Sequence, residues 1–306
     1  SQQQLNVTSF GATGMALITF EAFSGMWINA FIISLLCKAW FKKKTLNSNE
    51  KILLLLGCSR FGYLSISWVY SFFSLFYPNY LSVHSIIQLA EGTQLFFNGS
   101  NLWVSACLCV FYCIKIANFR NSFFIYLKVK IDRIVPWLLL GSVLFSLLIG
   151  ILVYDISDKL HCNKSTSQGN SWEVKYRTDE HYFLVYFIIG LLFVTSFTAV
   201  IFSPLLLLFS LWRHKRNMQT NSMKDLSVDA HIRAMKSILS FLVMYNINFA
   251  SFFVTTVYSV EGLHPIMFLL YVVLFAFPGV HSLILIFSNS KLENTMLRIL
   301  LLMKCK

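Results

Sequence analysis

Seven long apolar runs dominate the sequence, and each is long enough to cross the hydrocarbon core of a lipid bilayer. A helix that spans a membrane satisfies all of its own backbone hydrogen bonds, so helices are the expected form of these runs. The chain is therefore predicted to be an all-α membrane protein, a single seven-transmembrane-helix bundle formed by residues 1–306. The predicted spans cover residues 12–38, 52–77, 86–113, 134–154, 183–212, 235–258 and 266–288.

The composition excludes a water-soluble domain, because 57% of the residues are hydrophobic and only 12% are charged. The net charge of +12 would suggest a nucleic-acid partner in a soluble protein. Here the basic residues flank the apolar runs, so membrane topology explains them better and no nucleic-acid partner is expected. The first run is long and has no basic residue before it, so it is predicted to be a span rather than a cleaved signal peptide.

The distribution of Lys and Arg between the runs predicts the orientation of the bundle. The segments 39–51, 114–133, 213–236 and 289–306 carry four to six basic residues each, whereas 1–11, 78–85 and 259–265 carry none. The remaining segment, 155–181, has four basic residues beside five acidic ones. Cytoplasmic segments are the ones enriched in Lys and Arg. The N-terminus is therefore predicted to lie outside and the C-terminus in the cytoplasm.

Possible sites of covalent modification follow from this orientation. Glycosylation sequons at Asn6 and Asn163 fall on the predicted outer side, while a third at Asn98 lies inside a span and is not expected to be used. Only Cys162 of the seven cysteines lies in a predicted outer loop, so no outer disulfide is expected. No spacing of Cys, His and carboxylates predicts a metal site. Cys305, next to two lysines, is a candidate for palmitoylation.

One face of the third span is polar. Glu91, Gln94, Asn98, Asn101 and Ser105 follow one another at spacings of three or four residues, so they form one stripe along a helix. In hydrocarbon such side chains must face protein or a water-filled cavity. Taken singly, each could simply bond a neighbouring helix. A whole stripe at one end of the span is better explained by a cavity that accepts a ligand.

A charged residue, Arg60, lies in the second span about 13 Å beyond Lys51, at 1.5 Å per residue. A charge at that depth must be paired or hydrated. The expected partners are polar groups of neighbouring spans, namely Asn29 in the first and Ser282 or Ser288 in the seventh. The favoured hypothesis is a structural lock between helices rather than a contact with ligand.

Polar and aromatic residues also lie in the outer parts of the last two spans. They are Asn248 and Phe252 in the sixth span, and Met267 and Tyr271 in the seventh. With the stripe of the third span they predict a small-molecule cavity with aromatic walls and a few amides. No motif for catalysis or for cradling phosphate is present, so neither an enzyme nor a cofactor is predicted.

Basic residues gather beneath the third, fourth and fifth spans, including Lys115, Lys128, Lys130, Arg213 and His214. Ordinary positive flanks and contact with membrane lipid headgroups explain part of this charge. The functional hypothesis is a basic, partly apolar surface that docks an intracellular partner.

Motifs along nearly the whole chain resemble those of the type 2 taste receptors, the bitter-sensing family of seven-helix G-protein-coupled receptors. Besides Asn29 and Ser59-Arg60, they are Leu102-Trp103, Val110-Phe111-Tyr112-Cys113-Ile114-Lys115-Ile116-Ala117-Asn118-Phe119, Pro136-Trp137, Phe209-Ser210-Leu211-Trp212-Arg213-His214, Ala230-His231-Ile232-Arg233-Ala234-Met235-Lys236-Ser237 and Pro278-Gly279-Val280-His281-Ser282. Each motif alone is weakly specific, but their order and spacing together are highly specific.

The resemblance implies a plasma-membrane receptor for small, amphiphilic bitter compounds, with a pocket among spans three, five, six and seven. It also implies coupling to a gustducin-type heterotrimeric G protein, and it matches Asn163 to the glycosylation site of the second outer loop. Tyr112, Lys115, His214 and His231 are then expected to help form the surface for the G protein.

The alternative from another class is a membrane channel or carrier for small solutes, with a hydrated path through Arg60 and Glu91. Signalling that needs a heterotrimeric G protein would favour a receptor. Solute flux or current in proteoliposomes without any G protein would favour the channel or carrier.

Overall fold

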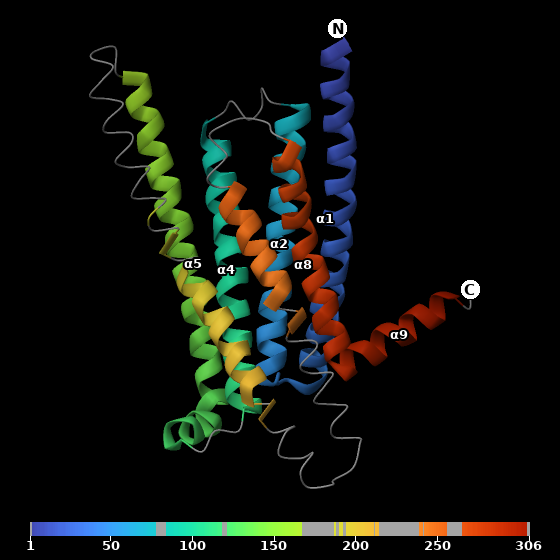
Figure 1. Ribbon diagram of the computed structural model, residues 1–306, viewed down its shortest axis with the longest axis vertical. Helices are drawn as coiled ribbons and strands as arrows, with labels where there is room; N and C mark the ends of the chain where they lie inside the picture. Colours follow the sequence, from blue (N-terminus) through green and yellow to red (C-terminus); the bar gives the residue numbers. More distant parts are fainter. Residues whose placement is uncertain are drawn as a thin grey trace.

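Helices are the only regular secondary structure in the part of the chain that the structure describes. The computed structural model describes residues 2–77, 84–117, 121–166, 187, 190–191, 194–210, 212–213, 239–240, 242–255 and 265–304. The long helices run side by side along one axis, and the last helix, α9, turns away from the bundle at the end opposite to the start of α1 (Figure 1).

Within these residues, five helices contain a stretch long and apolar enough to cross a membrane. They are α1 (Gln2–Lys43), α2 (Ser48–Phe76), α4 (His84–Ile116), α5 (Ser122–Thr166) and α8 (Pro265–Ser288). Two shorter apolar helices, Val194–Ser210 and Leu242–Thr255, lie inside the predicted fifth and sixth spans. The prediction of an all-α membrane protein with several spans is confirmed.

Several helices extend beyond the apolar runs from which they were predicted. α5 begins at Ser122 and ends at Thr166, so much of the two segments expected to be loops around the fourth span is helical. The tail after the seventh span also forms a helix, α9 (Ser290–Lys304). Hydropathy detects only the part of a helix that lies in the hydrocarbon core of the membrane. Helical turns rich in Lys and Asp can continue beyond it, in water or at the lipid surface.

A tight turn connects α1 to α2 and fixes them as antiparallel neighbours. Lys44, directly after α1, has a left-handed conformation with φ 55°, and its N–H donates to the carbonyl of Trp40 at 2.7 Å. At the start of α2, the Glu50 carboxylate accepts from the backbone N–H of Asn47 at 3.1 Å. A Glu three residues after the N-cap satisfies a backbone donor that the helix itself leaves open.

Glycines let two pairs of helices approach closely. A Cβ added to Gly150 of α5 would lie 2.8 Å from the carbonyl oxygen of Gly92 in α4, and one added to Gly279 of α8 would lie 3.1 Å from Cα of Gly25 in α1. Small residues at such crossings are typical of helix packing in membranes. α4 contacts both α2 and α5, and α1 contacts both α2 and α8.

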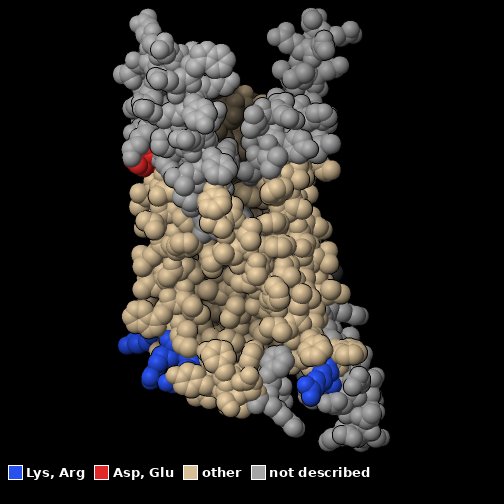
Figure 2. Space-filling view, turned by 60° about the vertical axis from the view of Figure 1, so that its left-hand side comes forward, with Lys and Arg blue, Asp and Glu red and all other residues tan. Residues whose placement is uncertain are grey.

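Stacked aromatic side chains join the two shorter apolar helices to the rest of the bundle. Phe197 stacks on Phe249 with ring centroids 4.1 Å apart, and Tyr245 meets the edge of Phe277 in α8 at 6.1 Å. Buried residues of α4 complete this apolar cluster. Few charged residues interrupt the surface here: on the face drawn in Figure 2, residues other than Lys, Arg, Asp and Glu form a broad belt across the middle of the bundle. Exposed side chains such as Trp137 suit lipid contact rather than water.

We predict that Gly150→Ala destabilises the fold, because its methyl group would press against the α4 backbone, and overpacking costs roughly 1–3 kcal/mol. Gly141→Ala in the same helix is the matched control, since a Cβ there meets nothing within 4 Å. The melting temperature of the detergent-solubilised protein should fall for Gly150→Ala and stay level or rise for Gly141→Ala. Equal values for the two variants would contradict the close α4–α5 crossing.

Candidate ligand-binding cavity

The side chain of Arg60 lies at the centre of the bundle with no exposed surface. Its Nε donates to Oδ1 of Asn101 in α4 at 3.0 Å, and its Nη1 donates to Oγ of Ser282 in α8 at 2.8 Å. Its Nη2 contacts Nδ1 of His281. Because a guanidinium has only donors, Nδ1 accepts, and the neutral imidazole then carries its proton on Nε2.

The network continues from α8 to α1. The Ser282 hydroxyl donates to Oδ1 of Asn29 at 2.8 Å, and Nδ2 of Asn29 donates to the carbonyl of Gly25 at 2.7 Å. Both side chains are fully buried. The network therefore links α1, α2, α4 and α8 through groups that would otherwise be buried without partners.

The structural lock was predicted to join Arg60 to Asn29 and to Ser282 or Ser288. Asn29 and Ser282 lie in the network, whereas Ser288 donates to the carbonyl of Ile284 in its own helix at 2.7 Å. An unpaired charge in this position would be costly, and each donor of the guanidinium that finds an acceptor reduces the cost. The contacts to Asn101 and His281 were not expected. In the motif Pro278-Gly279-Val280-His281-Ser282, His281 directly precedes the expected partner Ser282. This is the sequence signal that could have suggested His281 as a further partner of Arg60.

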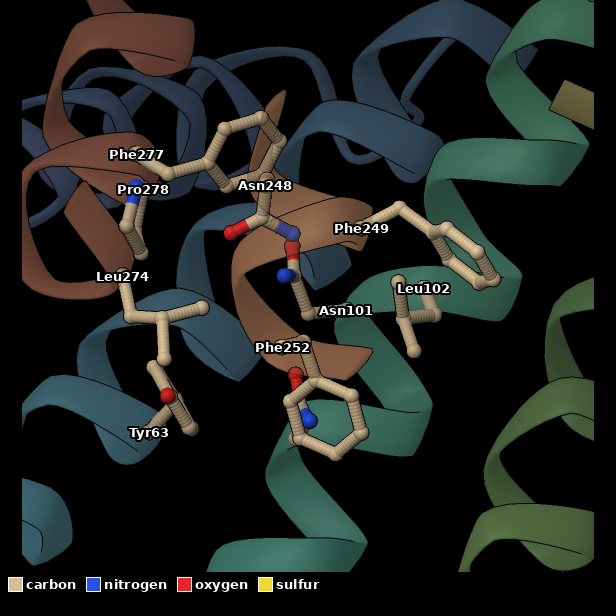
Figure 3. A pocket seen from close by; sticks show the side chains of 10 residues that line it. Tyr63, Asn101, Leu102, Asn248, Phe249, Phe252, Leu274, Phe277 and Pro278 are labelled. Atoms are coloured by element: carbon tan, nitrogen blue, oxygen red, sulfur yellow. The ribbon is translucent and has the colours of Figure 1, made fainter. Parts of the chain in front are cut away.

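A small cavity lies next to this network, between α2, α4, α8 and the helix Leu242–Thr255 (Figure 3). Four of the predicted ligand-binding residues line it: Asn98, Asn101, Asn248 and Phe252. The other lining residues are Tyr63, Leu102, Phe249, Leu274, Phe277 and Pro278. Asn101 belongs to both the cavity and the Arg60 network, so one amide connects the two.

The cavity is almost closed in this conformation. The space that the centre of a water molecule can occupy is about 10 Å³, roughly enough for one water molecule. Pro278 has no N–H to donate to the Leu274 carbonyl, so the helix hydrogen bonding of α8 is interrupted at the cavity wall. A ligand larger than water requires the aromatic side chains of the wall to move.

The remaining predicted ligand-binding residues lie outside this lining. Gln94, one helical turn from Asn98, donates to Oγ of Ser67 in α2 at 3.0 Å. Glu91 and Tyr271 are exposed positions of α4 and α8. For Met267 the structure describes the position in α8 but not the side chain.

The cavity residues that sequence reasoning missed are mostly aromatic or aliphatic. Leu274 follows Tyr271 by three residues, and Pro278 follows Leu274 by four. Both therefore share a face of α8 with Tyr271, which was predicted to bind ligand. Tyr63 lies one turn from Arg60 in α2. In a chain with 30 Phe, apolar spacing alone does not distinguish a cavity wall from ordinary packing.

A larger groove between the N-terminal half of α1 and the C-terminal end of α2 is a poorer candidate. It measures about 500 Å³ and is lined by Ala12, Met15, Ala16, Thr19, Phe20, Trp68, Phe72 and Phe76. The hydroxyl of Thr19 already accepts from Nε1 of Trp68 at 3.0 Å. Specific small-molecule sites combine apolar walls with a few convergent polar groups, and the cavity beside Arg60 meets that description better.

Two of the residues expected to contact a G protein, Tyr112 and Lys115, lie near the opposite end of α4. Tyr112 donates its hydroxyl to Oδ1 of Asn49 in α2 at 3.1 Å, and Nζ of Lys115 lies 2.6 Å from Oδ2 of Asp132 in α5. Arg213 is exposed. His214, His231 and Cys305 lie outside the described residues. Asn6 and Asn163 are described only as positions in α1 and α5.

We predict that Ser282→Ala lowers the melting temperature of the solubilised protein. It would leave Nη1 of Arg60 and Oδ1 of Asn29 without this partner, and a buried polar group left unpaired costs roughly 1–3 kcal/mol. Ser34→Ala is the control, because that exposed hydroxyl donates only within α1, to the carbonyl of Ala30. An equal effect of the two substitutions would mean that Ser282 does not hold the helices together.

Comparisons with known proteins identify the family. The family profile described as "Taste receptor protein (TAS2R)" matches residues 7–304. Human taste receptor type 2 member 2 is 32% identical over 292 residues, which cover 94% of this chain and 95% of the relative. Taste receptor type 2 member 9 of Papio hamadryas is also 32% identical, over 94% of this chain and 93% of the relative. Member 114 of the mouse is 31% identical over 95% of this chain and 94% of the relative.

These matches extend over nearly the whole length of both partners. The family consists of seven-helix receptors and not of enzymes, which agrees with the several membrane-spanning helices of this chain. The chain belongs to the type 2 taste receptor family.

Proposed function

We propose that this taste receptor binds small, amphiphilic bitter compounds in the cavity beside Arg60 and activates a gustducin-type heterotrimeric G protein. The observation that carries the proposal is the position of Asn101, which lines the cavity and accepts from Nε of Arg60. A compound that displaces or engages this amide acts directly on the contacts that join α2, α4 and α8.

The length of α4 provides the connection to the other end of the bundle. Asn98 lines the cavity, and Lys115 lies 17 residues later in the same helix, about 25 Å away at 1.5 Å per residue. A shift or rotation of α4 at the cavity therefore reaches the residues proposed to face the G protein. Tyr112 and Lys115 are the described residues of α4 in that proposal.

Agonist binding must favour a conformation different from this one, since the cavity has room for about one water molecule. Phe249 and Phe252 belong to the shorter helix Leu242–Thr255, whose side chains form one wall. A ligand that fits only when this wall moves outward shifts the population toward the open form by its differential affinity. Glu91, Gln94, Met267 and Tyr271 are proposed as the outer entrance to the cavity, because they lie before it in α4 and α8.

The alternative of a channel or carrier has less support. Its proposed path runs through Arg60, and that side chain has no exposed surface and contacts three polar partners. In the described part of the chain, such a path would require the whole network to separate.

We predict that cells that express this chain with a gustducin-type α subunit respond to at least one compound of a bitter panel with released calcium. The response should disappear when the α subunit is omitted. Asn98→Ala and Asn248→Ala should each raise the half-maximal agonist concentration about tenfold, which corresponds to about 1.4 kcal/mol of lost contact.

Asn246→Ala is the matched control for the cavity, because it lies two residues from Asn248 and donates to the carbonyl of Leu242 in its own helix. Surface expression is measured for every variant. Unchanged potency in both cavity variants would remove the cavity from the proposal, and a response that persists without any G protein would favour the channel or carrier.

The proposed orientation has the N-terminus outside and the C-terminus in the cytoplasm. On the face drawn in Figure 2, the described Lys and Arg residues gather at one end of the bundle. That is the end of α9 in Figure 1, opposite to the start of α1. A basic end is expected to face the cytoplasm.

We expect an epitope tag at the N-terminus to be stained on intact cells and a tag at the C-terminus to be stained only after permeabilisation. Asn163→Gln should remove one glycan and increase electrophoretic mobility, and the double variant Asn6→Gln/Asn163→Gln should migrate like the enzymatically deglycosylated protein. Staining of the C-terminal tag on intact cells would reverse the orientation.

A further inference from the structure

The first turn of α2 contacts three other helices through three consecutive side chains, Ser48, Asn49 and Glu50, which we name the first-turn cluster. Oγ of Ser48 donates to the carbonyl of Asp132 in α5 at 3.4 Å. Oδ1 of Asn49 accepts from the hydroxyl of Tyr112 in α4 at 3.1 Å. Oε1 of Glu50 lies 2.6 Å from Nζ of Lys291 in α9.

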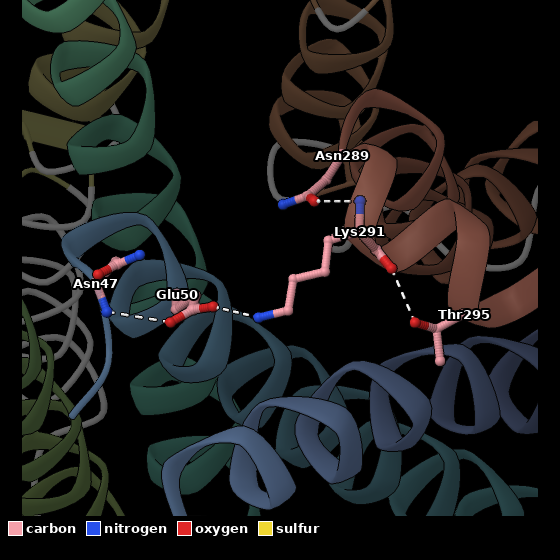
Figure 4. Close-up of polar contacts among 5 residues, drawn as sticks. All are labelled: Asn47, Glu50, Asn289, Lys291 and Thr295. Atoms are coloured by element: carbon pink, nitrogen blue, oxygen red, sulfur yellow. Dashed lines mark hydrogen bonds and ion pairs between the residues drawn. The ribbon is translucent and has the colours of Figure 1, made fainter. Parts of the chain in front are cut away.

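Figure 4 shows how the contact with α9 is built. Asn289 directly precedes α9, and its Oδ1 accepts from the backbone N–H of Lys291 at 3.1 Å, which orients the first turn of that helix. A cation near a helix N-terminus is disfavoured by the helix dipole, so the position of Lys291 depends on a compensating anion. Glu50 supplies it, and the same carboxylate accepts from the N–H of Asn47 at 3.1 Å.

The burial of Glu50 distinguishes these contacts from the ion pair between Lys115 and Asp132. Glu50 keeps only 11% of its side-chain exposure although Lys291 is 53% exposed, and Asn49 and Tyr112 are partly buried. Lys115 and Asp132 are 37% and 55% exposed, and exposed ion pairs contribute little to stability. The contacts of Asn49 and Glu50 therefore carry more of the connection between helix ends.

We infer that the first-turn cluster keeps the G-protein end of the bundle closed, and that the bonds Asn49–Tyr112 and Glu50–Lys291 restrain the resting receptor. This inference rests on the proposed function. An opening between α2 and α4 breaks the first bond, and a displacement of α9 from α2 breaks the second. Each bond therefore favours the closed conformation, and its removal shifts the equilibrium toward the open one without agonist.

The inference assigns Tyr112 a role that differs from direct contact with the G protein. If the hydroxyl restrains the resting state, Tyr112→Phe and Asn49→Ala remove the same bond from opposite sides and act in the same direction. If the hydroxyl instead contacts the G protein, Tyr112→Phe lowers signalling and Asn49→Ala leaves it unchanged.

The test measures agonist-free nucleotide exchange on a purified gustducin-type heterotrimer, with membranes that contain equal amounts of each variant. Tyr112→Phe and Asn49→Ala should each raise the basal rate roughly two- to tenfold, the range that one net hydrogen bond supports. The double variant should show no more than the larger single effect. Glu50→Lys and Lys291→Glu should each raise the rate, and their combination should restore it toward the original value.

Thr295→Val is the matched control, because that hydroxyl donates to the carbonyl of Lys291 within α9 and joins no second helix. A second readout needs neither agonist nor G protein. Cys113, which follows Tyr112 and is buried, should react faster with a maleimide in Asn49→Ala than in Thr295→Val, as measured by mass spectrometry of its peptide.

Unchanged or lowered basal exchange in Tyr112→Phe and Asn49→Ala, in a receptor that responds to agonists, would overturn the inference and leave the cluster a static brace. A receptor that responds to no compound counts against the proposed function instead. In that case equal Cys113 labelling in Asn49→Ala and Thr295→Val overturns closure by the cluster, and faster labelling in Asn49→Ala supports it.

Discussion

The guanidinium of Arg60 is the group on which the arrangement of the bundle depends. A charge without exposed surface is tolerated only where its donors meet acceptors. Here the acceptors come from Asn101 in α4 and from His281 and Ser282 in α8, while Asn29 of α1 accepts from Ser282. Because apolar side chains gain little from leaving lipid, such directional contacts do much to decide which helices meet and in which register.

The same network gives the cavity its position. Asn101 turns one polar atom to Arg60 and also lines the space bounded by Asn98 and Asn248. The restraint at the bundle centre and the candidate ligand site are therefore parts of one structure. At the far end of α4, Tyr112 bonds the first turn of α2, so α4 makes polar contacts with α2 both at the bundle centre and at this end.

The polar stripe of the third span shows which part of the candidate site could be predicted from the sequence. Periodicity correctly predicts that Gln94, Asn98 and Asn101 share one face of a helix. It does not state what that face meets along its length. Gln94 donates to Ser67 of α2 and Asn101 accepts from Arg60 of the same helix, whereas Asn98 and Asn101 also line the cavity. Which residues of the stripe reach the cavity depends on how the neighbouring helices cross α4.

The amino-acid sequence by itself determined the class of protein, the family, and the need for Arg60 to find partners such as Asn29 and Ser282. Those conclusions follow from hydropathy, motif order and the cost of a buried charge, which are properties of local sequence. Only the tertiary structure decided that His281 joins the network, that Phe249 and Pro278 form cavity walls, and that Glu50 meets Lys291, 241 residues away along the chain. Contacts of this kind depend on how each helix is rotated about its axis and at which angle it crosses its neighbours. The periodicity of the sequence does not determine these two quantities, and the glycine pairs and polar bonds of the folded bundle select one packing.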